Sequence, residues 1–198
     1  MDLMGAIFTR RSVRSFASRS VDRDAVMVLI RAAVWAPSAV NQQPWSFVVI
    51  SNRRRLNEYS DRAKQYMFST LPGAISMHGR ADALADPSYH AFHRAPVLVV
   101  IYAKPARYNP VGDCCMAAQN LLLAAHGLGL GACPVGFARA WFDLREIKYE
   151  LGVPDSHCAV MPIAAGWPKG PPEASTRLEP DILAWDEGPS DQAGSPEA

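Results

Sequence analysis

The stretch APSAVNQQPWSFVVI, residues 36 to 50, joins a polar segment directly to an apolar one. Pro37 and Pro44 bracket the polar part, and prolines fix the backbone while keeping a segment out of regular structure. The apolar part, WSFVVI, is rich in β-branched residues, as buried strands are. The polar part offers donors and acceptors that suit the edge of a planar heterocycle, and its side chains are Ser38, Asn41, Gln42 and Gln43. A capped helix end followed by an ordinary loop is the alternative interpretation.

Helices and strands are mixed along the rest of the chain. Apolar periodicity predicts helices over 2–9, 22–35, 53–66, 112–131 and 143–152, with Asp22, Asp113 and Asp143 as N-terminal caps. Apolar runs predict buried strands over 45–51, 95–103 and 157–167, and a short strand or turn over 132–137. Because strands and helices do not alternate regularly, the expected fold class is α+β rather than a doubly wound parallel sheet.

Length and composition indicate one globular domain. The chain has 198 residues, of which 49% are hydrophobic and 20% charged, enough for one substantial core. We expect a single domain over 1–187 and a mobile polar tail over 188–198. A net charge of +1 excludes a global field that attracts nucleic acid or anionic membrane. The chain has no apolar run long enough to cross a bilayer and no signal peptide, so we expect a cytoplasmic protein.

Cysteines and histidines do not form a metal-binding pattern. Cys114, Cys115, Cys133 and Cys158 include no CxxC pair, which indicates reduced core thiols. The one close histidine pair, His90 and His93, has no second pair near it, so no metal site is expected.

The basic run RRSVR offers a candidate anion site. If the segment is extended, Arg10, Ser12 and Arg14 point to the same side. Guanidinium groups match phosphate oxygens bidentately, and the hydroxyl adds a further donor. A solvated basic turn is the alternative.

The glycines of GLGLGACPVG have the spacing of a dinucleotide fingerprint. Gly127, Gly129 and Ala132 fit GxGxxA, but that fingerprint requires a strand before the glycines and a helix after them, whereas here the order is reversed. These glycines are therefore expected to close a helix, and Gly136 to let the backbone approach a ligand.

Four motifs together resemble the FMN-dependent nitroreductase family. They are TRRSVRSF, APSAVNQQPWSFVVI, AAQNLLLAAHGLGLGACPVGF, and AAGWP followed by Arg177, in that order and over nearly the whole chain. The resemblance implies a nitroreductase-like α+β fold, with a central, mostly antiparallel sheet flanked by helices. It also implies an intertwined homodimer that binds two FMN molecules at the subunit interface.

The resemblance also implies the FMN-binding residues, which are Arg10, Arg11, Ser12, Arg14, Pro37, Ser38, Ala39, Asn41, Pro134, Val135, Gly136 and Arg177. Arg10, Ser12 and Arg177 correspond to phosphate or ribityl ligands, and Arg14 to a residue on the pyrimidine side. The segment 37–41 corresponds to the part given by the partner subunit, and 134–136 to backbone near the flavin N5. Ser175 stands where many relatives have a second basic residue, and ACPVGF lacks the glutamate of the enteric nitroreductases.

The implied activity is hydride transfer from NADH or NADPH through flavin N5 to an electron-poor acceptor such as a nitroaromatic, quinone or enone. No catalytic side chain is predicted, because solvent can protonate the product. Residues 66–94 are expected to form a lid, and aromatic side chains either shape the acceptor pocket or belong to the core: Trp35, Tyr66, Phe68, Phe137 and Trp141. The alternatives are reductive dehalogenation, a flavin-consuming reaction, a non-catalytic FMN-binding module, or a basic arm for polyanions.

Overall fold

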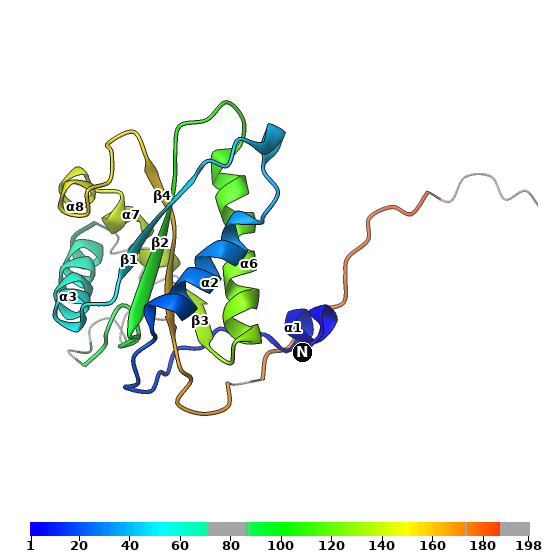
Figure 1. Cartoon of the computed structure of the whole chain (residues 1–198), viewed down its shortest axis with the longest axis horizontal. Coiled ribbons are helices and arrows are strands. Elements are labelled where there is room, and N and C mark those ends of the chain that lie inside the picture. Colours follow the sequence, from blue (N-terminus) through cyan, green and yellow to red (C-terminus); the bar gives the residue numbers. More distant parts are fainter. Residues whose placement is uncertain (71–85, 87, 173, 187–198) are drawn as a thin grey trace, which may run out of the picture.

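The computed structural model describes residues 1–70, 86, 88–172 and 174–186, and these residues form a four-stranded antiparallel sheet. The strands are β1 (Trp45–Ile50), β2 (Val97–Ala103), β3 (Gly131–Pro134) and β4 (Cys158–Gly166), in the order β1-β2-β4-β3 (Figure 1). The central strand β2 is buried along its whole length, as its sequence VLVVIYA predicts.

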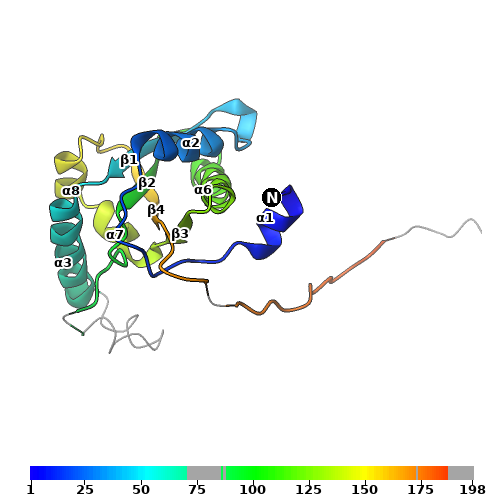
Figure 2. The ribbon, with the colours of Figure 1, turned by 60° about the horizontal axis from the view of Figure 1, so that its bottom comes forward.

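Helices cover both faces of the sheet. They are α2 (Arg23–Val34) and α6 (Pro110–Gly127) on one face, and α3 (Arg53–Thr70), α7 (Arg139–Phe142) and α8 (Arg145–Glu150) on the other (Figures 1 and 2). Strand β2 serves both cores with alternate side chains: Val97, Val99 and Ile101 pack toward α2 and α6, while Leu98 and Val100 pack toward α3 and α7. The predicted α+β class and the antiparallel sheet are confirmed.

Two of the three predicted caps are wrong. Asp22 does cap α2, since its side chain accepts from Ala25 N at 2.7 Å. Helix α6 begins earlier than expected, because Asn109 caps it and Pro110 takes the first helical position, leaving Asp113 inside the first turn. The helix expected over 143–152 is the shorter α8, and Asp143 is the C-cap of the preceding α7 instead of the N-cap of α8.

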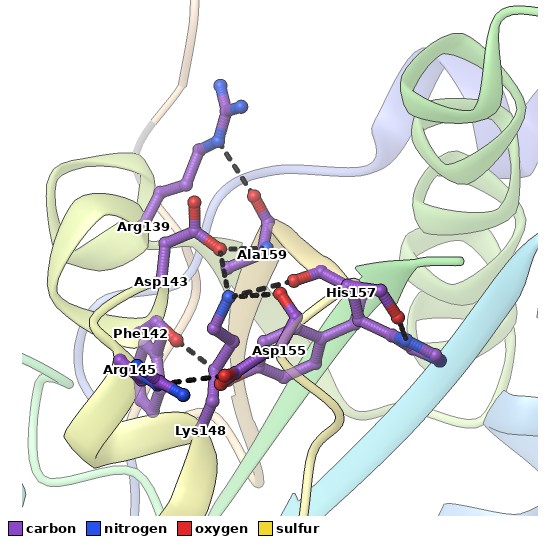
Figure 3. A network of polar contacts seen from close by, with 10 residues as sticks. Arg139, Phe142, Asp143, Arg145, Lys148, Asp155, His157 and Ala159 are labelled. Carbon is purple, nitrogen blue, oxygen red and sulfur yellow. Dashed lines mark hydrogen bonds and ion pairs between the residues drawn. The ribbon is translucent and has the colours of Figure 1, made fainter. Parts of the chain in front are cut away.

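A buried lysine fastens α7 and α8 to the start of β4 (Figure 3). Lys148 Nζ donates to Asp155 O at 2.9 Å and to His157 O at 3.1 Å, and lies 3.8 Å from Asp143 Oδ1. The same Asp143 oxygen accepts from Ala159 N at 2.9 Å, and Arg139 Nε donates to Ala159 O at 2.8 Å. The chain that follows Gly136 is thereby held rigidly against the sheet.

Helix α1 (Leu3–Thr9) and the chain after β4 extend away from this body (Figures 1 and 2). Both carry exposed apolar side chains, among them Leu3, Phe8, Leu178, Leu183 and Trp185. None of the described helices is long and apolar enough to cross a bilayer. The predicted tail, 188–198, lies outside the described residues, as does most of the predicted lid, 71–85 and 87.

Candidate functional site

The basic run after α1 lines a cavity of about 270 Å³ together with the chain after β4. We name this cavity the arginine pocket, and its lining residues are Arg10, Arg11, Ser12, Arg14, Ala174, Ser175 and Arg177. Four arginines thus line one cavity, and no carboxylate is found among those of its lining residues that the structure describes. The structure brings together all five basic-run and late-arginine residues predicted for the site.

Arg10 is the residue whose environment most clearly lacks a counter-charge. Its Nη1 is buried and has no hydrogen-bond partner among the described residues. Burial, followed by repulsion from Arg177 and Arg11, lowers the pKa of Arg10. Since arginine keeps its charge in proteins, an anion bound here would offset the repulsion among these arginines.

A close approach of two strands sets the position of the basic run. Ser12 pairs with Ala132 as a parallel bridge, and Val13 N donates to Ala132 O at 3.2 Å. Gly131 makes this possible, because a Cβ there would lie 2.6 Å from the Val13 side chain. The run therefore lies along β3 through Ser12 and Val13, which is the extended arrangement on which the shared direction of Arg10, Ser12 and Arg14 depends.

A second cavity, of about 430 Å³, shares Ser12 and Arg14 with the arginine pocket. We name it the lysine pocket, and its lining residues are Ser12, Val13, Arg14, Ser15, Lys169, Gly170, Pro171 and Pro172. Lys169 N donates to Ser15 O at 3.0 Å, which ties the chain after β4 to the basic run. Sequence reasoning missed Lys169, although a lysine directly after AAGWP was the available signal.

The segment 134–136 begins at Pro134, the last residue of β3, near the basic run. Val135 N donates to Pro162 O at 2.8 Å, and the Val135 side chain belongs to the core, so only its backbone can face a ligand. Gly136 begins the short 3-10 helix η2 (Gly136–Ala138), and a Cβ added there would meet nothing within 4 Å among the described residues.

The polar segment after α2 forms a compact turn that we name the elbow, residues 38–43. It contains the 3-10 helix η1 (Ala39–Asn41). Ser38 Oγ accepts from Gln43 N at 3.0 Å, and Asn41 Oδ1 accepts from Gln43 Nε2 at 3.0 Å. Apolar side chains are exposed on and beside it, with Val40 at 78% and Trp35 at 86%. Pro37, just before it, is also exposed.

The elbow and the chain that leads from α1 into the basic run lie at opposite ends of α6 (Figure 1). The elbow contacts Asp113 in the first turn of α6, whereas Thr9 Oγ1, next to the basic run, lies 2.8 Å from His126 Nε2 in its last turn. The helix rises about 20 Å between these two residues. One chain therefore does not bring its own elbow to its own arginine pocket.

The predicted aromatic residues divide into core and surface. Trp141 is 2% exposed and packs against Tyr59 with ring centroids 5.2 Å apart, so it belongs to the core. Phe68 is 44% exposed, while Tyr66 and Phe137 are half-buried.

Metal-binding groups do not gather in the described part of the chain. No three histidine, cysteine or acidic side chains there converge as metal ligands. The four cysteines are free thiols, and burial raises the pKa of Cys114 to about 12, which makes that thiol unreactive.

Comparison with known proteins places the basic run and the elbow within the match to one family. The model of the Nitroreductase family matches residues 7–167, which include the basic run, the elbow and 134–136. A protein of Archaeoglobus fulgidus, provisionally named an NADH dehydrogenase/NAD(P)H nitroreductase, is 30% identical over 184 residues, covering 89% of this chain and 93% of that protein.

Solved structures share the fold. A nitroreductase from Bacteroides fragilis with bound FMN superposes with a TM-score of 0.81 at 24% identity, covering 94% of this chain and 100% of that chain. A protein from Desulfovibrio desulfuricans in complex with FMN superposes with a TM-score of 0.67 at 28% identity, covering 90% and 92% of the two chains.

Proposed function

This chain belongs to the nitroreductase family, and on that premise we propose that it is an FMN-dependent oxidoreductase. In this proposal it passes a hydride from NADH or NADPH to an electron-poor small molecule such as a nitroaromatic, quinone or enone. FMN, when bound, supplies the redox chemistry at its N5 position, and the chain's own residues bind and orient the reactants. The family membership itself confirms the resemblance seen in the sequence.

The observation that carries this proposal is Arg10 Nη1, which has no hydrogen-bond partner among the described residues. This atom is buried, Arg10 lines the pocket together with Arg11, Arg14 and Arg177, and the described lining residues include no carboxylate. A phosphate monoester brings two negative charges and three acceptor oxygens, which such a set of donors suits. The arginine pocket therefore fits the phosphate of FMN, with Ser12 and Ser175 as further donors.

The lysine pocket continues the site beyond the phosphate. Because Ser12 and Arg14 line both cavities, a ligand whose phosphate fills the first and whose remainder enters the second contacts them along its length. Arg14 and Lys169 provide positive charge there, which would stabilise the negative charge of a reduced flavin ring. A unit charge at about 4 Å contributes roughly 4 kcal/mol at an intermediate dielectric, before desolvation is subtracted.

We propose that the elbow of a second copy completes each site. The elbow lies about 20 Å along α6 from the arginine pocket of its own chain. In a twofold dimer, a contact of the first chain's elbow with the second chain's arginine pocket is repeated with the two chains exchanged. Two chains can therefore form two equal sites, each with arginines from one chain and an elbow from the other. The exposed apolar side chains of α1 and of residues 178–185 supply surface for such an assembly.

No side chain of this chain is assigned a proton-transfer role. The hydride donor and the acceptor occupy the same site in turn, so the proposal implies ping-pong kinetics. Solvent supplies the proton to the product, and the chain's task is to hold the reacting molecules in contact.

The variant Arg10→Ala tests the phosphate assignment. Loss of a charged hydrogen bond should raise the dissociation constant for FMN roughly 10- to 100-fold, measured by fluorescence titration of the apoprotein. The control is Arg54→Ala, which removes an exposed arginine from α3 on the far face of the sheet. Equal affinity in the two variants would contradict the assignment.

Turnover is tested separately from binding. The FMN-loaded protein is mixed anaerobically with NADH or NADPH, and loss of flavin absorbance reports reduction. Acceptors from the nitroaromatic, quinone, enone and halophenol classes are then added in turn. A protein that binds FMN but is not reduced by either nicotinamide is a flavin-binding module, and that outcome would reject the enzymatic proposal.

A further inference from the structure

The elbow has a backbone shape that its own residues do not favour. Val40, Asn41 and Gln43 have positive φ angles of 47°, 56° and 45°. Asparagine tolerates this left-handed region, but a β-branched valine rarely adopts it, because Cβ crowds the neighbouring carbonyl. A backbone of this kind persists only where the surrounding structure holds it.

Bonds within the elbow do not attach it to the rest of the fold. Ser38 accepts from Gln43 N through its hydroxyl and from Asn41 N through its carbonyl, both at 3.0 Å. Gln42 N donates to Ala39 O at 3.0 Å. These contacts close the turn on itself, so its placement relative to the sheet depends on another residue.

Asp113 is the residue that makes the attachment. Its side chain is buried, with the residue 3% exposed. Both carboxylate oxygens accept from Ala39 N at 3.3 Å, and Oδ2 also accepts from Gln42 Nε2 at 2.8 Å. Within the described part of the chain, every hydrogen bond from 38–43 to another element ends on Asp113.

We infer that Asp113 is a positioning residue, whose carboxylate holds the elbow in the shape that presents Ser38 and Asn41 to the flavin of a second copy. This inference rests on the proposed function, because it takes the elbow as part of the FMN site. Asp113 itself touches no ligand, since it is buried and both of its oxygens are engaged with the elbow. It acts by keeping the binding-competent shape populated.

The chemistry of the contact distinguishes two substitutions. In Asp113→Asn, the remaining oxygen accepts from Ala39 N, and the new amide donates to Gln42 once the Gln42 amide turns over. The attachment survives in that variant. In Asp113→Ala no acceptor is left for either donor, so the elbow is released from α6.

Flavin affinity of three variants tests the inference. Asp113→Ala should raise the FMN dissociation constant about tenfold, because apparent affinity falls with the fraction of competent protein, while Asp113→Asn should stay within roughly threefold of wild type. Tyr102→Phe is the matched control, since it removes a buried hydrogen bond to Phe142 O on the opposite face of the sheet. It should leave FMN affinity unchanged.

Hydrogen exchange of the apoproteins gives a readout that needs no flavin. The Ala39 amide should exchange faster in Asp113→Ala than in wild type, Asp113→Asn or Tyr102→Phe. Unchanged exchange, or unchanged FMN affinity, in Asp113→Ala would overturn the inference. A wild type that takes up no FMN would instead reject the proposed function, while exchange at Ala39 would still test the attachment.

A milder variant covers the case in which Asp113→Ala does not fold. Gln42 is only half-buried, and Gln42→Ala removes one of the two donors to Asp113. It should weaken FMN binding about threefold, less than loss of the whole attachment. If Gln42→Ala leaves either the FMN affinity or the exchange of the Ala39 amide at the wild-type level, the inference is wrong.

Discussion

At the scale of single residues, His90 shows how a local contact makes stability depend on pH. The Phe92 amide donates to His90 Nδ1 at 3.1 Å, so Nδ1 is an acceptor, and Nε2 then carries the hydrogen and lies 3.1 Å from Asn57 Oδ1. A second proton on Nδ1 would face the Phe92 N–H. Burial, which is the main cause, lowers the pKa of His90 to about 4.

The consequence is a loss of stability in mild acid. The unfolded chain binds a proton at His90 below about pH 6.5 and the folded chain only below about 4, so the free energy of unfolding falls as pH decreases through that window. Between about pH 7 and 5 this loss is about 2 kcal/mol. Chemical denaturation at both pH values should show a smaller loss in His90→Gln, and equal losses in the two proteins would contradict the assignment.

Residue chemistry was predictable where a residue type has few roles. Three arginines within five positions indicated an anion site, and Arg10, Arg14 and Arg177 do meet around one pocket. Asp113 was assigned to the wrong role, because an aspartate near a helix start is a common cap. Its bonds to Ala39 and Gln42 join residues more than seventy positions apart, a pairing that spacing does not reveal.

At the scale of elements, the basic run depends on how closely the chain can approach the sheet. Glycines allow contact at two places. Gly131 lies against Val13, and a Cβ at Gly166 would come within 3.0 Å of Phe16 and closer still to Pro96. Because these glycines have no side chain, the chain that contains the basic run can pack closely against the sheet. The arginine pocket depends on this close packing.

Replacing Gly131 by alanine should separate the run from β3. The added Cβ would lie 2.6 Å from Val13, so the strands must move apart, which should cost about 1–3 kcal/mol of unfolding free energy. FMN affinity should fall as well, because Arg10 and Arg14 shift with the run. Thermal unfolding and flavin titration measure the two effects.

The matched control lies four residues earlier in the chain. A Cβ at Gly127, the last residue of α6, would meet nothing within 4 Å among the described residues. Gly127→Ala should therefore be neutral or stabilise by about 0.5–1 kcal/mol, through lower entropy of the unfolded chain. Similar losses in both variants would show that the close approach at Gly131 is unimportant.

Element types were predictable from periodicity, whereas element ends were not. The run VLVVIYA and the apolar pattern after Asp22 indicated β2 and α2, because burial dictates their spacing. The start of α6 depends on Asn109 and Pro110, a cap pair that competes with Asp113. The left-handed backbone at Val40 contradicts local preference and is held by a distant carboxylate, so no local pattern predicts it.

At the scale of the whole molecule, large apolar side chains are exposed both beside the elbow and on the chain after β4. Leu178, Leu183 and Trp185 are 96%, 93% and 74% exposed, and Trp35 beside the elbow is 86% exposed. The proposed assembly with a second copy would cover such side chains. The sequence alone does not distinguish these side chains from core residues, because both are simply apolar.

Mixing two defective chains tests whether each site is shared between copies. One chain carries Arg10→Ala, which damages the arginine pocket. The other carries Asn41→Gly, which removes the Asn41 side-chain amide while keeping the left-handed backbone accessible. In a twofold dimer each mixed pair holds one site with both parts intact, so equal mixing should restore about one quarter of the sites. Flavin occupancy after co-expression of the two chains with different tags measures this fraction. A site formed within one chain would give no restoration, because every such site would carry one of the two defects, and the shared-site arrangement would then be wrong.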